Sequence, residues 1–226
     1  MTAIAPEAPV AFPRPSAGGL YAGLASAERY IHRSRDRAFI AMLRRQGVDV
    51  LTGLRIAELG CGEGAFLGTL LYYGAEPALL EGIDVDGGRV ARARAKLPGV
   101  SVAQADIACL PFASSSFDLA FAFTAFSSVL DVQARRHGAL EAMRVLRRGG
   151  LLIVYDFWTN PANRHVRPLP ERELRAMFSS RPVDIERVTL APPIARLLRG
   201  RRALCEPLER LPFLRTHLLA AVRKDA

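Results

Sequence analysis

The sequence has few cysteines, almost no lysine and no long apolar run. Its 226 residues contain one tryptophan and three cysteines, and the only lysines are Lys96 and Lys224. Cys61, Cys109 and Cys205 are too widely spaced for a disulfide framework or a zinc site. No stretch approaches the roughly 20 apolar residues that a membrane-spanning helix needs. We therefore expect no disulfide, no metal site and no membrane partner, and a location in a reducing cytoplasm.

The composition is that of an ordinary globular chain. Apolar residues make up 50% and charged residues 23%, which excludes disorder throughout. The 18 glycines and 15 prolines show no repeat period, which excludes a fibrous protein, and the N-terminus lacks the layout of a signal peptide. The net charge of +9 admits an anionic or nucleic-acid partner. However, the arginines are scattered and no block of five basic residues occurs, so a scattered surface charge is the simpler interpretation.

Apolar strands alternate with helices through the middle of the chain. Residues 1–19 are rich in proline and glycine and are expected to form a loose tail, followed by a single domain over residues 20–226. A helix is expected over residues 26–46, with Ser26 as its N-cap and Gly47 as its stop signal. Short apolar runs predict strands at 55–59, 79–83, 100–103, 117–123 and 151–155. Helical stretches between several of them indicate an α/β fold with a parallel sheet covered on both faces.

The pattern changes after residue 155. A polar loop is expected over 160–170 and a short helix over 171–178. Strands are expected at 183–190 and 217–223, with one helical stretch over 192–211 between them.

A strand that runs directly into a glycine-rich turn is the most specific signal. Residues 55–66 read Arg-Ile-Ala-Glu-Leu-Gly-Cys-Gly-Glu-Gly-Ala-Phe. Glycine is needed where the backbone turns tightly or touches a ligand, and the N–H groups of the following helix point at the same place. The turn satisfies the pattern that binds pyrophosphate in dinucleotide enzymes. Glu58 and Glu63 would repel a pyrophosphate, and they suit a ligand that carries a positive amino or sulfonium group.

The segment Glu58-Leu-Gly-Cys-Gly-Glu-Gly64 resembles the first motif of the class I S-adenosylmethionine (SAM) dependent methyltransferases, of the methyltransferase type 11 kind. Further segments follow in the order of that family. They are Gly82-Ile-Asp84 at the end of a second strand, Ala105-Asp106-Ile107 as an adenine-binding segment, Ser116-Phe-Asp-Leu119 in a fourth strand, and residues 144–150 before a fifth. The resemblance covers about residues 55–155. It implies a doubly wound, Rossmann-like sheet of seven strands in the order 3-2-1-4-5-7-6, with the last strand antiparallel and an N-terminal helical lid.

The resemblance also implies SAM as the cofactor and assigns residues to it. Asp84 lies 24 residues after Gly60, close to the roughly 20-residue offset of a ribose-binding acid. Asp106 could accept a hydrogen bond from the adenine amino group, and Ile107 could pack on the base. Taken alone, an Asp at a strand end is most often a helix N-cap. The expected cofactor residues are Glu58, Gly60, Cys61, Gly62, Gly64, Asp84, Val85, Asp106, Ile107 and Phe123.

The acceptor of the methyl group is expected above the carboxyl ends of the fourth and fifth strands. Asp156, in an apolar setting that would raise its pKa, is the expected general base, and His165 is the alternative base. Equally open is that Asp156 caps the next turn and that His165 is simply exposed. His217 is expected to be a strand-pairing or core residue. The remaining expected acceptor-side residues are Ser127, Tyr155 and Trp158, with Tyr21, Arg29, Tyr30 and His32 in the lid.

The function implied is methyl transfer to an oxygen or nitrogen atom of a small molecule, such as a glycan or a secondary metabolite. Three alternatives stay open: an RNA methyltransferase, which only the net charge favours, an NAD(P)-dependent oxidoreductase on the same turn, and a non-catalytic SAM-binding protein. We expect no specific nucleic-acid partner, since no RNA-binding motif is visible. A homodimer is compatible with the sequence.

Overall fold

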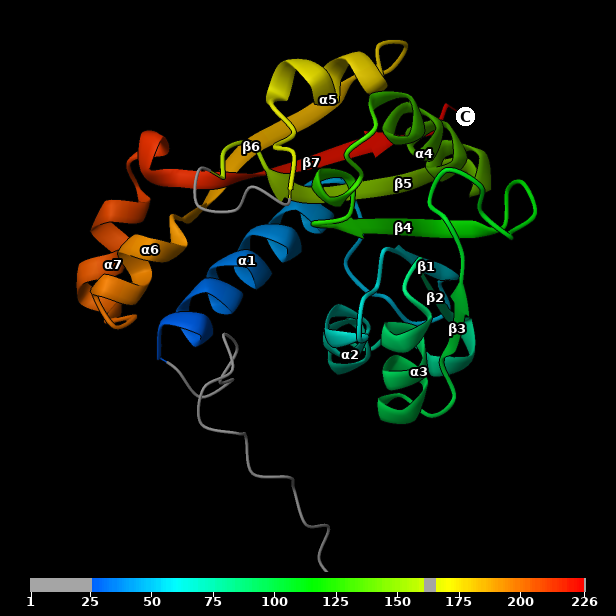
Figure 1. The fold of residues 1–226 in the computed structure, drawn as a ribbon, viewed down its shortest axis with the longest axis horizontal. Helices are drawn as coiled ribbons and strands as arrows, with labels where there is room; N and C mark the ends of the chain where they lie inside the picture. The colour runs from blue at the N-terminus through cyan, green and yellow to red at the C-terminus, as the bar shows by residue number, and fades with distance from the viewer. Residues whose placement is uncertain (1–25, 161–165, 226) are drawn as a thin grey trace, which may run out of the picture.

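The computed structural model describes residues 26–160 and 166–225, and all seven of its strands lie in one sheet (Figure 1). The strand order is β3-β2-β1-β4-β5-β7-β6, as predicted. Strands β1 to β5 are parallel, and β7 is antiparallel to both β5 and β6. The strands are β1 (Ile56–Leu59), β2 (Leu80–Asp84), β3 (Ser101–Gln104), β4 (Phe117–Phe123), β5 (Leu146–Phe157), β6 (Val183–Leu190) and β7 (Arg215–Arg223).

Helices cover both faces of the sheet (Figure 1). Side chains of α1, α2 and α3 contribute to the core on one face, and those of α4 and α5 contribute to the core on the other. The two short helices α6 and α7 lie between β6 and β7 in sequence and pack beside α1 in a third, smaller cluster. The helices are α1 (Ser26–Arg45), α2 (Ala65–Tyr72), α3 (Gly87–Lys96), α4 (Val132–Val145), α5 (Glu171–Met177), α6 (Pro192–Leu197) and α7 (Arg202–Glu209), with single 3-10 turns η1 (Pro77–Leu79), η2 (Phe126–Ser128) and η3 (Pro212–Leu214).

The alternation of side chains along the central strands decides which residues meet the ligand-binding edge. In β5, Ile153 and Tyr155 point to the α1 face, whereas Val154 and Asp156 belong to the α4 face. Every residue of β4 is buried, as expected for a parallel strand that is covered on both sides. Neighbouring residues of the predicted site therefore lie on opposite faces of the sheet.

The prediction of one continuous helix over 192–211 is wrong, because the chain turns between α6 and α7. Arg199 and Gly200 have φ angles of +51° and +62°, which an α-helix does not contain. Gly200 lies so close to the backbone of Ser26 that a Cβ at this position would overlap it. The hydroxyl of Ser26 donates to the carbonyl of Arg199. The approach of α1 therefore requires the break.

Two other boundaries differ from the sequence analysis. Strand β5 begins at Leu146 and not at 151, since Leu146 pairs with Phe117 before the register shifts. Helix α1 ends at Arg45, and Gly47, with φ of +78°, follows it as the expected stop.

Some expectations concern residues that the structure does not describe. The tail over 1–19 lies outside the described residues, as do the lid residue Tyr21 and the alternative base His165. That residues 20–226 form one domain stays a prediction, with which the single sheet agrees. No helix of the described chain is long and apolar enough to cross a membrane.

Candidate functional site

The glycine turn joins β1 to α2 at the carboxyl edge of the sheet. Gly60, Gly62 and Gly64 have φ angles of +80°, +54° and +79°, a region that other L-residues rarely adopt. A Cβ on Gly60 would lie 2.8 Å from the Cβ of Ala125, whereas a Cβ on Gly62 would meet nothing within 4 Å. Gly60 is therefore required by packing, and Gly62 by the turn itself, with open space beside it.

Asp84 fastens this turn to the end of β2. Its Oδ2 accepts a hydrogen bond of 2.8 Å from the backbone N–H of Gly62, and its Oδ1 accepts one of 3.0 Å from that of Asp86. Each carboxylate oxygen has two lone pairs, so acceptor capacity remains for hydroxyl groups of a ligand. The next residue, Val85, is exposed, and its carbonyl accepts a hydrogen bond from Gln104.

Glu58, in β1, is a buried carboxyl group with an unpartnered atom. The side chain is only 2% exposed, and its Oε2 has no hydrogen-bond partner in the described structure. Burial raises its pKa well above the ordinary value, while the positive charge of Arg35 acts in the opposite direction. A buried acceptor without a partner costs free energy, so this oxygen suits a donor or a cation supplied by a ligand.

Cys61, within the turn, is a packing residue. Its Sγ would lie 3.0 Å from a Cβ placed on Gly82, so it fills the space between the ends of β1 and β2. Burial raises the pKa of the thiol to about 12, which keeps it protonated and unreactive at neutral pH.

The segment after β3 contains the residues expected to bind adenine. Asp106 is exposed, and its Oδ1 accepts a 2.8 Å hydrogen bond from the backbone of Ala108. Ile107 is buried and faces α4, since its Cγ2 and Cγ1 atoms would lie 3.3 and 3.4 Å from a Cβ on Gly138. Asp106 is thus accessible to a ligand, and Ile107 belongs mainly to the core under α4.

An arginine that the sequence analysis did not select lies beside the turn. Arg35 projects from α1 and is held by two hydrogen bonds to Asp36, at 2.9 and 2.8 Å. Its guanidinium carbon lies 5.3 Å from the ring centre of Phe66 and 5.8 Å from that of Phe123, within the range of cation–π attraction. Arg35 is four residues from Ile31 and from Phe39, on the apolar stripe of α1, and a charge on that stripe is the signal that could have identified it.

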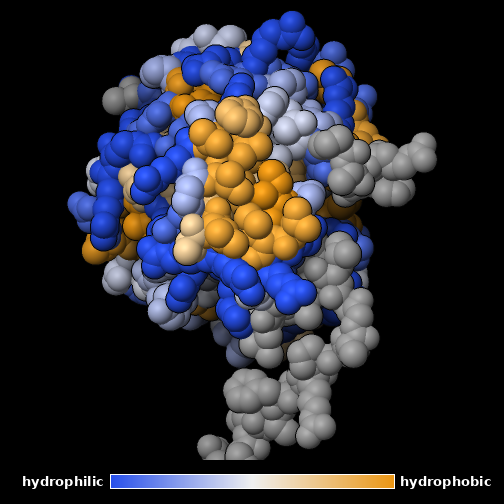
Figure 2. Space-filling model, turned by 90° about the vertical axis from the view of Figure 1, so that its left-hand side faces the viewer, coloured by the Kyte–Doolittle hydropathy of each residue, from blue (hydrophilic) through white to orange (hydrophobic). Residues whose placement is uncertain are grey.

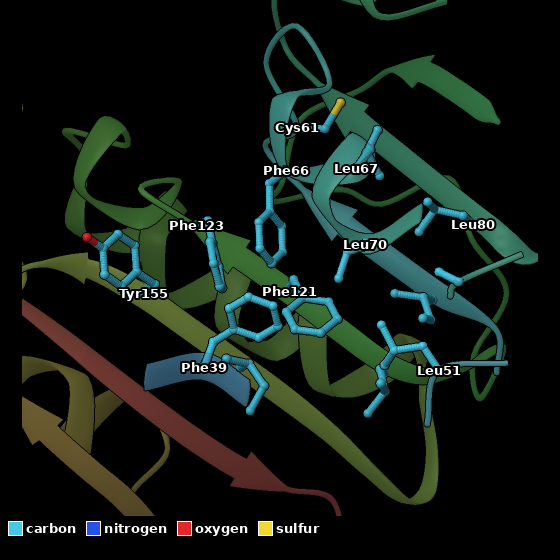
Figure 3. Close-up of a cluster of buried hydrophobic side chains, with 14 of the residues drawn as sticks. Phe39, Leu51, Cys61, Phe66, Leu67, Leu70, Leu80, Phe121, Phe123 and Tyr155 are labelled. Carbon is cyan, nitrogen blue, oxygen red and sulfur yellow. The ribbon is translucent and has the colours of Figure 1, made fainter. Parts of the chain in front are cut away.

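Phe123 belongs to an aromatic cluster on this face of the sheet (Figure 3). Its ring stacks on that of Phe66, with centres 3.8 Å apart. Phe39 of α1 makes edge contacts with both rings and with Phe121. Helix α1 therefore packs against the site through the ring of Phe39. That α1 acts as a lid stays a prediction.

Tyr155 closes the same cluster at the end of β5. Its ring stacks on His217 of β7, with centres 4.5 Å apart and planes 7° apart, and lies 5.3 Å from Phe123. Its hydroxyl is 3.0 Å from Oγ1 of Thr189. Burial raises the pKa of Tyr155 and lowers that of His217 to about 3, so both side chains are neutral near pH 7. His217 is the paired, buried residue that was expected.

Asp156 lies on the opposite face and is fully buried. Its Oδ2 accepts the backbone N–H of Ser127 at 2.9 Å, and its Oδ1 accepts that of Phe157 at 2.8 Å. Burial raises its pKa to about 6, in the predicted direction. Asp156 thus caps the β4–α4 connection, whereas the expected alternative was a cap of the turn that follows it, and its role as a base stays a prediction.

Ser127 and Trp158 also form hydrogen bonds with other residues of the protein. Ser127 is buried, and its carbonyl accepts the backbone N–H of Arg167 at 2.9 Å. The indole N–H of Trp158 donates to the carbonyl of Arg215 at 2.8 Å, and the guanidinium of Arg187 covers its ring at 4.3 Å. Contact of either residue with an acceptor stays a prediction.

A polar pocket of about 560 Å³ opens between α1, β6 and α7. Thr189 lines it and connects it to Tyr155 through the hydroxyl contact. Glu209 lines it too and accepts hydrogen bonds from Tyr30, Ser34 and the backbone of Leu190. The other residues that line the pocket are Ser34, Arg37, Ala38, Glu186, Val188, Arg202, Glu206, Arg210 and Arg215.

Comparison with known proteins gives one consistent result. Residues 57–154 match the model of a family described as a methyltransferase domain. A probable S-adenosylmethionine-dependent methyltransferase of Mycolicibacterium smegmatis is 29% identical over 181 residues, which are 73% of this chain and 63% of that protein. Residues 57–154 therefore match a methyltransferase domain, and the strand order agrees with the Rossmann-like fold of SAM-dependent methyltransferases.

One further relative and one solved structure of the same fold are named for different acceptors. A ubiquinone/menaquinone biosynthesis C-methyltransferase of Campylobacter jejuni is 30% identical over 112 residues, 46% of this chain and 45% of that protein. A possible histamine N-methyltransferase of Thermotoga maritima has the same fold, with a TM-score of 0.64 over 91% of this chain and 95% of that one, at 20% identity. The chain spans about half the length of the curated relatives that it matches.

The cofactor of this family is SAM, and the residues present fit it. The unpartnered oxygen of Glu58 offers an acceptor to a cationic group, and the space beside Gly62 admits a ligand against the backbone. Of the two acids expected to repel a dinucleotide pyrophosphate, Glu58 lies beside the turn, whereas Glu63 is paired with Arg92 and Lys96. No group of three potential metal ligands gathers within residues 26–160 and 166–225.

Proposed function

We propose that this methyltransferase domain transfers the methyl group of SAM to an oxygen or nitrogen atom of a small molecule at the carboxyl edge of β1, β4 and β5. The observation that supports this best is the buried Glu58 carboxyl beside the glycine turn, whose Oε2 has no hydrogen-bond partner among the described residues. A cationic ligand at this position would supply the missing interaction.

The cofactor, when bound, supplies a methyl group that the positive sulfur has already activated. Asp84 would accept hydrogen bonds from the ribose hydroxyls while it keeps Gly62 in place. Asp106 is exposed and would accept a hydrogen bond from the adenine amino group. Gly60, Gly62 and Gly64 would let the ligand lie against the backbone, and Cys61 and Val85 would border it.

The acceptor would lie against Phe123, the last residue of β4, and Tyr155, two residues before the end of β5. Their rings and those of Phe66 and His217 form an apolar wall that would exclude water and orient the acceptor for in-line attack. Arg35, beside the rings of Phe66 and Phe123, would hold an anionic group of the acceptor. Positioning of this kind needs no base when the acceptor is an amine, and a hydroxyl acceptor would need one.

A carbon acceptor is the second candidate. It is favoured by the similarity of the chain to a C-methyltransferase of quinone biosynthesis and by the aromatic wall, which suits a planar ring. An RNA acceptor has only the net charge in its favour.

The experiment is a transfer assay with SAM that carries a labelled methyl group. The purified chain is incubated with a small-molecule extract and, separately, with total RNA, and the labelled products are separated by size and identified by mass spectrometry. The proposal expects label in low-molecular-weight products on oxygen or nitrogen, and none with Gly62→Val, whose added side chain would occupy the space beside the turn. Label on carbon supports the second candidate. Label in RNA, or consumption of NAD in place of SAM, contradicts the proposal.

A further inference from the structure

An apolar patch covers one end of the molecule. Nine large apolar side chains are exposed in the described chain, and four of them lie within residues 197–213. They are Leu197 of α6, Leu204 of α7, Leu211, and Phe213 of η3, with exposed fractions of 81%, 47%, 39% and 69%. Figure 2 shows this end as a broad hydrophobic surface surrounded by hydrophilic side chains. A contiguous patch of this kind marks an interaction surface.

Uncompensated positive charge lies within the same segment. Arg199, Arg201 and Arg210 are exposed and form no ion pair within residues 26–160 and 166–225. The acidic residues of α7 do not balance them. Glu206 pairs with Arg202 and Arg37, and Glu209 accepts hydrogen bonds from Tyr30 and Ser34. The segment therefore combines exposed leucine and phenylalanine side chains with three guanidinium groups that have no ion pair in the described chain, of which that of Arg210 also borders the polar pocket.

Helix α7 explains how the patch and the pocket coexist. Arg202, Glu206 and Glu209 follow one another at helical spacing and line the polar pocket beside α1. Leu204 lies on the outer side of the same helix and is exposed. The helix is thus amphipathic: Cys205 and Leu208 pack into the cluster beside α1, and Leu204 stays exposed.

We propose that this surface, formed by α6, α7 and η3, docks the protein on an anionic lipid membrane. Apolar side chains that enter the interface between arginines that reach anionic headgroups are the pattern of a peripheral membrane surface. The expectation of no membrane partner came from the length of apolar runs, which concerns spanning helices and not a surface of this kind. The proposal does not depend on the proposed function.

A second copy of the chain fits the surface less well. Two copies that met face to face through this patch would bring Arg199, Arg201 and Arg210 of each copy close to those of the other. Like charges in a partly dry interface cost free energy. An anionic bilayer instead neutralises the same groups.

The test is flotation of the full chain with vesicles of phosphatidylcholine alone and with vesicles that contain about 30 mol% phosphatidylglycerol. One variant, Leu197→Glu with Phe213→Glu, removes the apolar contacts. A second, Arg199→Gln with Arg201→Gln and Arg210→Gln, removes the free charges. Each variant has a matched control on another face of the protein. Leu140→Glu with Tyr72→Glu changes two exposed apolar residues. Arg44→Gln with Arg136→Gln and Arg172→Gln changes three exposed arginines that have no ion pair in the described chain.

The proposal expects binding to the anionic vesicles and none to phosphatidylcholine alone. The apolar variant should bind at least tenfold more weakly, and the arginine variant roughly 100-fold more weakly, at about fivefold per arginine, while both controls bind like the wild type. Unchanged thermal unfolding would show that the variants fold.

Three results would overturn the proposal. The first is failure of the wild type to float with anionic vesicles. The second is retention of binding by the apolar variant, which would leave only unspecific charge attraction. The third is a concentration-dependent dimer in sedimentation that Leu197→Glu with Phe213→Glu abolishes, which would assign the face to contact between copies.

Discussion

The hydroxyl of Tyr155 lies 3.0 Å from Oγ1 of Thr189, and Thr189 has a φ angle of +63°. A β-branched residue in this region of backbone space is a genuine outlier. Thr189 is buried in β6 and lines the polar pocket. Backbone strain of this kind persists only where the surrounding structure holds it in place, and it is concentrated at functional sites. The contact between Tyr155 and Thr189 connects the polar pocket to the proposed methyl-transfer edge.

Substitution of Thr189 should reverse the usual order of alanine and glycine. Thr189→Ala and Thr189→Gly both remove the contact with Tyr155, but only alanine keeps a Cβ in the left-handed region. We expect Thr189→Gly to be the more stable variant by about 1 kcal/mol, measured by urea denaturation. At Val188, in the same strand with ordinary φ, alanine should be the more stable by about 0.5–1 kcal/mol. If alanine is more stable than glycine at both positions, the backbone of Thr189 is not strained.

Arg135 should be irreplaceable even by lysine. It is fully buried, its guanidinium donates to the carbonyls of Val129 and Arg167, and it pairs with Glu173 at 2.8 Å. Lysine keeps the charge but not the planar set of donors. We expect Arg135→Lys to lose about 2–4 kcal/mol of unfolding free energy, as for other broken buried charge networks. The neighbouring Arg136→Lys, at an exposed residue, should stay within about 0.5 kcal/mol, and equal losses would be evidence against the network.

Asp156 should make a pH-dependent contribution to stability. Its pKa in the folded protein is raised to about 6, whereas an unfolded Asp titrates near 3.9. The folded state therefore holds more protons between about pH 4 and 6, so this contribution falls as the pH rises through that window and is level above it. The full change is at most about 3 kcal/mol.

His217 acts in the opposite direction over much of the same window. Its folded pKa of about 3 lies below its unfolded value, so its contribution is present above about pH 6.5 and is lost as the pH falls. The effect of Asp156 is thus measured as the difference in unfolding free energy between the wild type and Asp156→Asn at pH 4 to 7. That difference should change in favour of the variant as the pH rises. A constant difference would show that Asp156 is not desolvated.

The central sheet was predictable because its signals are local. Glycines at 60, 62 and 64, an acid at 84 and apolar runs between them specify a strand, a turn and a second strand without reference to the rest of the chain. The order of the last strands came from the resemblance, and the structure confirms it.

The acceptor side was harder to predict because its contacts are tertiary. Arg35 becomes part of the site only because α1 packs across Phe66 and Phe123. The break at Gly200 results from the approach of Ser26, 174 residues away in the sequence. Sequence could place Asp156 at the end of β5, but the face to which it points and the backbone groups that it binds depend on the β4–α4 connection.

Titration of the purified chain with SAM, followed by calorimetry, tests the central claim most directly. The account predicts saturable binding of SAM and none of NAD. Asp84→Ala should weaken SAM binding by about tenfold or more, since hydrogen bonds to a charged acceptor contribute roughly 1.5–3 kcal/mol each. Asp118→Ala, in which the lost carboxylate binds the backbone of Arg55 at the opposite end of the strands, is the control and should leave the affinity unchanged. Binding of NAD in place of SAM, or equal SAM affinity in Asp84→Ala and the wild type, would contradict the account.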